Sequence, residues 1–240
     1  MIDTILGTKR DEVKALKKKR FGRRKKPVVP VTFDGEINII AELKRRSPSA
    51  GFIAEIDTDR IRIYSRYAKA ISVLADTTYF GGSPEFVEEV AMQTHLPILY
   101  KDFIIDPVQI DQAYASGADI ILLIVRILAR DELASLYCHA QDLGLACLVE
   151  LHARDELERL SDLDAEIVGV NARDLDTLQI DLDRASEMLS KVYAPMRIAE
   201  SGIKSRNDIE RFTAANGFLI GETLMRSKDL EATFAELLHG

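Results

Sequence analysis

The sequence predicts a single (β/α)8 barrel, the α/β fold also called a TIM barrel, with an extra helix before its first strand. Three observations lead to this prediction. Short apolar runs rich in β-branched residues recur along the chain, a segment with helical periodicity follows most of them, and eight such runs fit into roughly 200 residues. Strands that alternate with helices pair in parallel through right-handed crossovers.

The eight expected strands begin at intervals of 21 to 33 residues. They are residues 37–43, 70–76, 96–102, 118–125, 145–151, 166–171, 196–201 and 217–222. Because the runs are apolar nearly throughout, we expect both faces of each strand to be buried. A doubly wound open sheet is the alternative, but no glycine-rich dinucleotide-binding motif follows the first run.

Capping residues mark three of the expected helices, at 106–117, 129–144 and 205–217. The first opens on Asp106 followed by proline, which suits the N-cap and the first helical position. The first two close on glycines, Gly117 and Gly144, as helices commonly do. Ser205 is the expected cap of the third, with an aspartate three residues later in an acidic variant of the capping box.

The chain before the barrel differs in composition from the rest. We expect residues 1–36 to form an N-terminal helix and a linker packed on a catalytic barrel at residues 37–240. The helix is expected within residues 3–19. Residues 27–36 contain two prolines and a glycine, so they form a linker or a cover over the bottom of the barrel.

Charge is spread unevenly along the chain. Residues 1–26 hold eleven Lys or Arg and three Asp or Glu, a charge of +8; the net charge is −7, so the remainder carries −7 − 8 = −15. The basic run at 17–26 suits a nucleic-acid arm, a solvated helix end, or a rim that attracts an anionic substrate. Its single aromatic, Phe21, and the lack of a recognisable nucleic-acid-binding fold argue against nucleic acid as a partner.

The sequence also narrows the cellular compartment in which we expect the protein. The longest apolar run, 120–125, is far shorter than the ~18 residues of a membrane span. The N-terminal residues mix charges among apolar side chains, unlike a signal peptide. Two cysteines, Cys138 and Cys147, without CxxC spacing fit a reducing compartment. We therefore expect a cytoplasmic protein with no membrane partner, as a monomer or weak homo-oligomer.

Several expected strands end on charged or polar residues. They are Glu42, Lys44, Lys101, Glu150, Asn171, Arg173, Glu200 and Ser201. Barrel enzymes build their active sites at these C-terminal ends. Alternation along a strand puts Glu42 and Lys44 on the same side. Charges gathered in one mouth are costly unless they pair, and pairing shifts pKa values as acid–base chemistry requires. A purely structural ring of ion pairs is the alternative.

Two glycines, Gly202 and Gly221, lie at the ends of the last two strands. Loops at this place usually bind phosphate in such barrels, and glycine lets backbone N–H groups approach closely. A phosphorylated small-molecule substrate is therefore expected. No second His or Cys is spaced with His152 to make a metal site, so we expect no metal.

Long stretches of the chain resemble the indole-3-glycerol phosphate synthase family. They include AELKRRSPSAGFI, ISVLADTTYFGGS, LPILYKDFIIDPVQIDQAYASGADIILLIVRIL, LVELH, VGVNARDLDTLQIDL, AESGIKSRNDI and FLIGETLMR, in order between about residues 37 and 228. The resemblance implies a carboxy-lyase of tryptophan biosynthesis. Such an enzyme converts 1-(2-carboxyphenylamino)-1-deoxyribulose 5-phosphate to indole-3-glycerol phosphate by ring closure, decarboxylation and dehydration, without a cofactor.

The resemblance also implies roles for individual residues. Lys101 matches the general acid for ring closure, and Glu150, Glu42 and Lys44 match groups used around dehydration and rearomatisation. Further matches are Asn171, Arg173, Glu200 and Ser201 for orientation, Ser47 and Lys44 for the carboxylate or phosphate, Gly202, Gly221 and the Glu222 N–H for the phosphate, and Phe80 and Leu175 for the aromatic ring. Residues 45–51 match a mobile loop over the site.

Departures and rivals accompany this resemblance. Tyr100 and Ala172 differ from the residues usual in the family at those positions. Phosphoribosylanthranilate isomerase shares the fold and phosphate site, but ELKRRSPS and KDFIID argue against it. A nucleic-acid-binding protein is the rival from another class. It would show salt-dependent affinity for DNA and no turnover.

Overall fold

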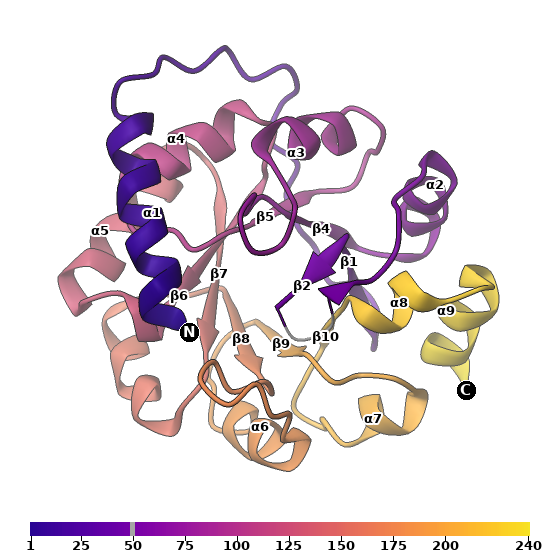
Figure 1. Cartoon of the computed structure of the whole chain (residues 1–240). Helices are drawn as coiled ribbons and strands as arrows, with labels where there is room; N and C mark the ends of the chain where they lie inside the picture. The colour runs from indigo at the N-terminus through magenta and orange to yellow at the C-terminus, as the bar shows by residue number, and fades with distance from the viewer. Residues whose placement is uncertain (49–50) are drawn as a thin grey trace.

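The computed structural model describes residues 1–48 and 51–240. Eight parallel strands form a closed barrel in the order β1-β10-β9-β8-β7-β6-β5-β4 (Figure 1). The strands are β1 Asn38–Leu43, β4 Ala70–Leu74, β5 Ile98–Lys101, β6 Ile120–Ile124, β7 Ala146–Leu151, β8 Ile167–Asn171, β9 Met196–Glu200 and β10 Gly217–Ile220. Each lies within an expected run. The predicted barrel is confirmed, and the open sheet is wrong.

Helices surround the barrel and also precede it. They are α1 Ile2–Leu16, α2 Thr58–Tyr67, α3 Pro84–Ala91, α4 Pro107–Ala115, α5 Arg130–Asp142, α6 Leu182–Leu189, α7 Arg206–Glu210, α8 Glu222–Arg226 and α9 Leu230–His239, with 3-10 segments η1 Val125–Ile127 and η2 Arg154–Asp162. The carboxylate of Asp106 accepts from the Val108 N–H at 3.1 Å. Gly117 and Gly144 have φ of 88° and 75°. These expected caps are confirmed.

The helix expected at 205–217 is much shorter than predicted. Asp208 does accept from the Ser205 N–H at 3.1 Å, as the capping box requires. The helix nevertheless ends at Glu210. Six residues later, the Asn216 side chain accepts from the Arg197 N–H at 2.8 Å and donates to the Pro195 carbonyl at 2.8 Å. These bonds hold the chain at the start of the neighbouring strand, where a continuing helix could not lie.

Two apolar layers account for the apolar strands. One fills the barrel and includes Ile40, Leu99, Ile120, Leu148 and Ile198. The other packs between strands and helices and includes Ile39, Ile71, Val73, Tyr100 and Ile121. Since side chains alternate, each strand contributes to both layers. Tyr100 therefore faces the helices, away from the barrel interior.

The chain after β1 forms a short hairpin over the barrel end. Strands β2 (Arg46–Ser47) and β3 (Gly51–Phe52) are antiparallel. Part of the loop expected to be mobile, residues 49–50, lies outside the described residues. The Arg46 guanidinium donates to the carbonyls of Thr77 and Thr78 at 3.0 and 2.7 Å, so the hairpin contacts the loop after β4. The mobility of residues 45–51 stays a prediction.

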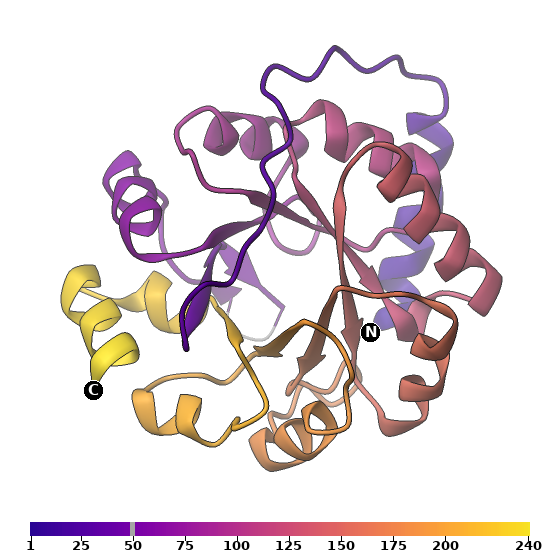
Figure 2. The same ribbon diagram turned by 180° about the vertical axis from the view of Figure 1, so that it is seen from behind.

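The N-terminal segment contacts both ends of the barrel. Helix α1 lies at the end that carries the hairpin (Figure 1). From behind, the segment before β1 crosses the other end (Figure 2). There, Val31 and Phe33 pack against the apolar layer inside the barrel. Phe33 fills the space beside Gly217, where a Cβ would lie 2.4 Å from its ring.

Basic side chains fasten this segment to the barrel. The Arg24 guanidinium donates to the carboxylate of Asp119 at 2.5 Å and to the carbonyl of Tyr114 at 3.2 Å. Asp119 also accepts from the N–H groups of Val29 and Ile98, each at 2.8 Å. It precedes β6, so Arg24 lies at the end opposite the strands' charged C-termini. Arg24 thus has a structural partner and is not part of a rim around the mouth.

Replacing Arg24 with Met should lower the free energy of unfolding by about 1–3 kcal/mol, because buried Asp119 loses its closest cationic partner while keeping two backbone donors. Urea-induced unfolding would measure this. The matched control is Arg23→Met at the exposed neighbouring position, which should change stability by less than about 0.5 kcal/mol. Equal effects of the two substitutions would contradict the assigned role of Arg24.

Candidate active site

A cavity of about 540 Å³ opens at the C-terminal ends of the barrel strands. The predicted site residues that line it are Glu42, Lys44, Ser47, Phe80, Lys101, Glu150, Asn171, Arg173, Leu175, Ser201, Gly202, Gly221 and Glu222. Glu200 lies beneath this lining, 1% exposed, and contacts Lys101. The structure therefore brings all the predicted residues to one place.

Four charged residues meet because of the way strands share the barrel interior. Glu42, Lys101, Glu150 and Glu200 come from β1, β5, β7 and β9, which are alternate strands around the barrel. Alternate strands contribute side chains to the same interior layer. The uppermost layer of this barrel is therefore charged, and the layers beneath it are apolar.

Lys101 occupies the centre of this layer. Its Nζ lies 3.2 Å from Oε2 of Glu200 and 3.4 Å from Oε2 of Glu150. Burial alone would lower the pKa of Lys101, but the charges of Glu200, Glu150 and Glu42 outweigh burial and raise it. The ammonium group therefore stays protonated, and its side chain remains 15% exposed toward the cavity.

The Glu200 carboxyl group lies deepest. Burial raises its pKa well above the usual range, and the nearby charge of Glu150 adds to this effect. Its Oε1 is buried and has no hydrogen-bond partner among the described residues. A Cβ at Gly169 would lie 2.1 Å from this oxygen, so only glycine leaves room for it. Burial thus favours the protonated form of the Glu200 carboxyl group, while its contact with Lys101 opposes that effect.

Glu42 and Lys44 form a pair beside Lys101. Oε1 of Glu42 lies 2.5 Å from Nζ of Lys44, which confirms that the two side chains face the same way. Burial would raise the pKa of Glu42, but the charges of Lys44 and Lys101 lower it instead. Gly221 lies directly against this pair: a Cβ there would be 2.3 Å from the same oxygen.

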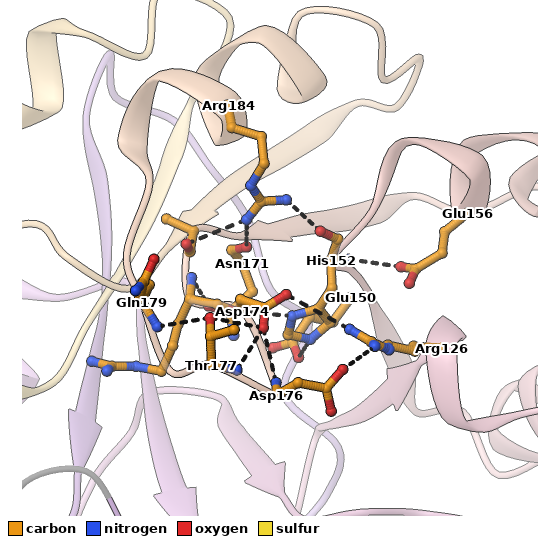
Figure 3. A network of polar contacts seen from close by, with 12 residues as sticks. Arg126, Glu150, His152, Glu156, Asn171, Asp174, Asp176, Thr177, Gln179 and Arg184 are labelled. Carbon is orange, nitrogen blue, oxygen red and sulfur yellow. Dashed lines mark hydrogen bonds and ion pairs between the residues drawn. The ribbon is translucent and has the colours of Figure 1, made fainter. Parts of the chain in front are cut away.

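The loop after β8 carries several cavity residues in a bonded frame. Oδ1 of Asn171 accepts from the Arg173 N–H at 3.0 Å, and the Arg173 guanidinium donates to the Leu178 carbonyl at 3.2 Å. The carboxylate of Asp174 accepts from the N–H groups of Asp176 and Thr177 (Figure 3). This frame places Arg173 and Leu175 at the cavity wall.

Backbone geometry at the last two strands suits an anion. Ser201 and Gly202 have φ of 68° and 81°, and a Cβ at Gly202 would lie 2.6 Å from Ile180. Gly221 precedes helix α8. The Glu222 side chain accepts from Nε of Arg226 at 2.9 Å and is about half exposed. The backbone N–H of Glu222, and not its side chain, is therefore the group suited to binding an anion.

Sequence reasoning missed a second buried ionic cluster beside the cavity. Nζ of Lys9 on α1 lies 2.8 Å from Asp76 and 2.7 Å from Asp102, and both acids line the cavity. Asp76 and Asp102 end two expected strand runs, which was a usable signal. Lys9 stands within the buried stripe of α1 between Ile5 and Val13, which was another.

Asp76 of this cluster also positions an aromatic side chain at the wall of the cavity. Oδ1 of Asp76 accepts from the N–H groups of Tyr79 and Phe80, at 2.5 and 3.0 Å. The Phe80 ring lies 6.2 Å from the ring of Phe103, centroid to centroid. Both rings line the cavity and form a wall for a flat ligand.

Across the described part of the chain, no three His, Cys, Asp or Glu side chains are grouped to hold a metal ion.

Comparison with solved structures bears on the fold. The chain is similar to a 3-hexulose-6-phosphate synthase from Salmonella typhimurium, with a TM-score of 0.68 and 13% identity over 83% of this chain and 96% of that one. It is also similar to thiamine phosphate pyrophosphorylase from Pyrococcus furiosus, with a TM-score of 0.63 and 14% identity over 84% and 94%. At such identities the likeness shows the barrel alone.

No helix among the described residues has the length and apolar character that crossing a membrane requires.

Comparison of sequences identifies the family. Residues 3–237 match the family model described as indole-3-glycerol phosphate synthase. Proteins of that name from Exiguobacterium sibiricum and Petrotoga mobilis are 41% and 38% identical, covering 100% and 98% of this chain and 97% and 96% of theirs. One from Leptospira interrogans is 44% identical over 83% of this chain and 81% of its own. The chain therefore belongs to the indole-3-glycerol phosphate synthase family.

Proposed function

We propose that this chain is a carboxy-lyase that makes indole-3-glycerol phosphate in tryptophan biosynthesis. Its substrate is 1-(2-carboxyphenylamino)-1-deoxyribulose 5-phosphate, which loses CO2 and water as the indole ring forms. The observation that carries the proposal is Nζ of Lys101 at the floor of the cavity, 3.4 Å from Glu150 and 3.2 Å from Glu200. Family membership agrees with it.

Lys101 is proposed as the general acid for ring closure. The aromatic carbon of the substrate attacks the ketone carbon, and the ketone oxygen gains negative charge. A proton from Nζ of Lys101 neutralises that oxygen as the bond forms. The acidic neighbours keep Lys101 protonated before the step. CO2 then leaves from the aromatic carbon that made the attack, and the electrons of the broken bond return to the ring.

The later steps need an acid for the departing hydroxide and a base for the proton lost on rearomatisation. Glu150 and the Glu42–Lys44 pair are proposed for these transfers, since their charged groups line the cavity around Lys101. Asn171, Glu200 and Ser201 are proposed to orient the substrate and these groups. Each would act by hydrogen bonding or by charge.

Substrate binding is proposed to divide the cavity into two halves. Phe80 and Leu175 would contact the aromatic ring. The remaining proposed contacts are Ser47 and Lys44 for the carboxylate or phosphate, Arg173 for orienting the substrate, and Gly202, Gly221 and the Glu222 N–H for the phosphate. The left-handed backbone at Ser201 and Gly202 supports the phosphate end.

We also propose a cytoplasmic location and action as a monomer or weak homo-oligomer without nucleic acid. Free Cys138 and Cys147 suit a reducing compartment. The proposed catalytic and substrate-binding residues all come from one chain, which supports action as a monomer. Sedimentation at several protein concentrations, with and without DNA, would test the oligomeric state and the nucleic-acid rival together.

Turnover of the proposed substrate is the direct test. The purified chain should convert it with the rise of indole fluorescence and release of one CO2 per indole formed. The isomerase rival would instead consume phosphoribosylanthranilate without releasing CO2. A folded chain that leaves the carboxyphenylamino substrate unchanged would overturn the proposed function.

A further inference from the structure

His152 is a buried histidine that the proposed chemistry leaves without a role. It lies just after β7, two positions beyond Glu150, and its side chain is 0% exposed. Its Nε2 lies 2.7 Å from Oε1 of Glu150, and its Nδ1 lies 3.1 Å from the carbonyl oxygen of Arg173 (Figure 3). Both ring nitrogens therefore face oxygen atoms.

These contacts limit where the protons can be. A carbonyl oxygen only accepts, so Nδ1 must carry a proton to make its bond. If Nε2 carried none, its lone pair would face Glu150, and the contact would require a protonated carboxyl group. The other oxygen of Glu150, Oε2, lies 3.4 Å from the Lys101 ammonium, which favours the ionised form. Protons on both ring nitrogens satisfy every contact.

The charges around His152 favour the same form. From η2, the Glu156 carboxylate accepts from the His152 backbone N–H at 2.7 Å. From α6, the Arg184 guanidinium donates to the His152 carbonyl, and from the loop after β8 the Arg173 carbonyl faces the ring. Burial alone would lower the pKa of His152, but the charges of Glu150 and Glu156 outweigh burial and raise it.

Farther across the charged layer stand Lys101 on β5 and Glu200 on β9. Burial alone would raise the pKa of Glu150, yet the charges of Lys101 and His152 lower it below its usual range. Glu150 thus lies between two basic side chains, with Lys101 at Oε2 and His152 at Oε1. Lys101 lines the cavity, and His152 lies behind Glu150, outside the lining.

We propose that His152 is a positioning residue for Glu150. Its doubly protonated ring holds Oε1 of Glu150 away from the cavity, keeps the carboxylate ionised, and leaves Oε2 as the oxygen that works beside Lys101. Glu150 enters the chemistry only through the proposed function, so this inference rests on that function.

The pH dependence of kcat separates a loss of charge from a loss of packing, because lost packing alone would not shift the pH profile. Without the imidazolium, Glu150 loses a stabilising positive charge and its pKa rises. If turnover requires ionised Glu150, the acidic limb of the kcat profile should move to higher pH by roughly one to two units. Below that limb, kcat should fall about tenfold for each pH unit.

Two substitutions separate charge from hydrogen bonding. His152→Gln puts an uncharged amide donor near the place of Nε2, and His152→Asn puts one near the place of Nδ1. Both should move the acidic limb upward. The matched control is His139→Gln on α5, where Nε2 of a partly exposed histidine pairs with Asp111 at 2.8 Å. The control should leave the profile unchanged.

A measurement on the unsubstituted protein covers the case in which these variants fail to fold. Nitrogen NMR of the ring distinguishes an imidazolium, with two similar nitrogen signals, from a neutral ring, with two widely separated ones. At about pH 7, above the ordinary histidine pKa of about 6.5, His152 should remain mostly an imidazolium.

The outcomes distinguish this inference from the proposed function. A neutral His152 ring at that pH, or a His152→Gln variant with the wild-type acidic limb, would overturn the positioning role while turnover stands. An imidazolium in a chain that fails to turn over the substrate would overturn the proposed function. The ring is read without substrate, so the two results are independent.

Discussion

Replacing Lys101 with Ala should lower kcat by about 10²–10⁴-fold, the usual contribution of a general acid. The ammonium group is the protonated donor at the floor of the cavity, and three acidic neighbours hold its proton in place. KM should change much less than kcat, because the proposed contacts to the aromatic ring and the phosphate lie elsewhere in the cavity. Indole fluorescence and released CO2, measured in parallel, would check the prediction.

Measuring both products locates the step. Ring closure precedes decarboxylation, so loss of the acid for ring closure should abolish CO2 and indole together. Release of CO2 without indole would instead assign Lys101 to dehydration. Lys101→Arg keeps the charge but provides a group that does not give up its proton, so it should be nearly as impaired as the Ala variant.

The matched control is Lys69→Ala. Lys69 precedes β4 at the opposite end of the barrel, where its Nζ lies 2.7 Å from Asp34 in an exposed pair. Its loss should change kcat by less than about twofold, since it is remote from the cavity. A Lys101→Ala variant that is folded by circular dichroism and retains kcat within about threefold would contradict the proposed acid.

The strand ends explain how much of the site could be predicted from sequence. An apolar run that closes on Glu42 or Lys101 shows both the strand and the residue at its mouth, because strand period and barrel topology are regular. The common side of Glu42 and Lys44 follows from alternation alone. The barrel and the gathering of these residues were therefore predictable, and both are observed.

Contacts between distant parts of the chain could not be predicted in the same way. The contact of Lys101 with Glu200 depends on the stagger of strands around the closed barrel, which no local pattern records. His152 resembles an ordinary histidine until its two oxygen neighbours are known. The short α7 depends on Asn216 bonding to a strand begun some twenty residues earlier, and local capping signals do not include that contact.

Helix α1 supplies the second large effect. Replacing Lys9 with Met should lower the free energy of unfolding by about 3–5 kcal/mol, because it leaves the carboxylates of Asp76 and Asp102 buried without their cation. Lys9 is 1% exposed, and Met fills nearly the same volume, so the loss is mainly electrostatic. Thermal unfolding should show a fall of about 10 °C or more.

The same helix offers the control. Lys14 pairs with Asp11 at 2.8 Å, three positions apart, but both side chains are more than 70% exposed. Lys14→Met should therefore cost less than about 1 kcal/mol. The double variant Lys9→Met with Asp102→Asn removes one of the two stranded charges and should recover a substantial part of the lost stability. No recovery would mean that Lys9 acts through packing.

The pH dependence of the Lys9→Met deficit tests its electrostatic origin. Burial raises the pKa of Asp102 to about 6 even with Lys9 in place. A carboxyl group with a raised folded pKa contributes stability at low pH that is lost as pH rises through the folded value. Loss of Lys9 raises that pKa further, so the deficit relative to wild type should be small under acidic conditions and grow as pH rises past about 6. A deficit independent of pH would contradict this assignment.

Because Asp76 also holds the backbone of Phe80, and Asp102 directly follows Lys101, the cluster under α1 fixes two sides of the cavity at once.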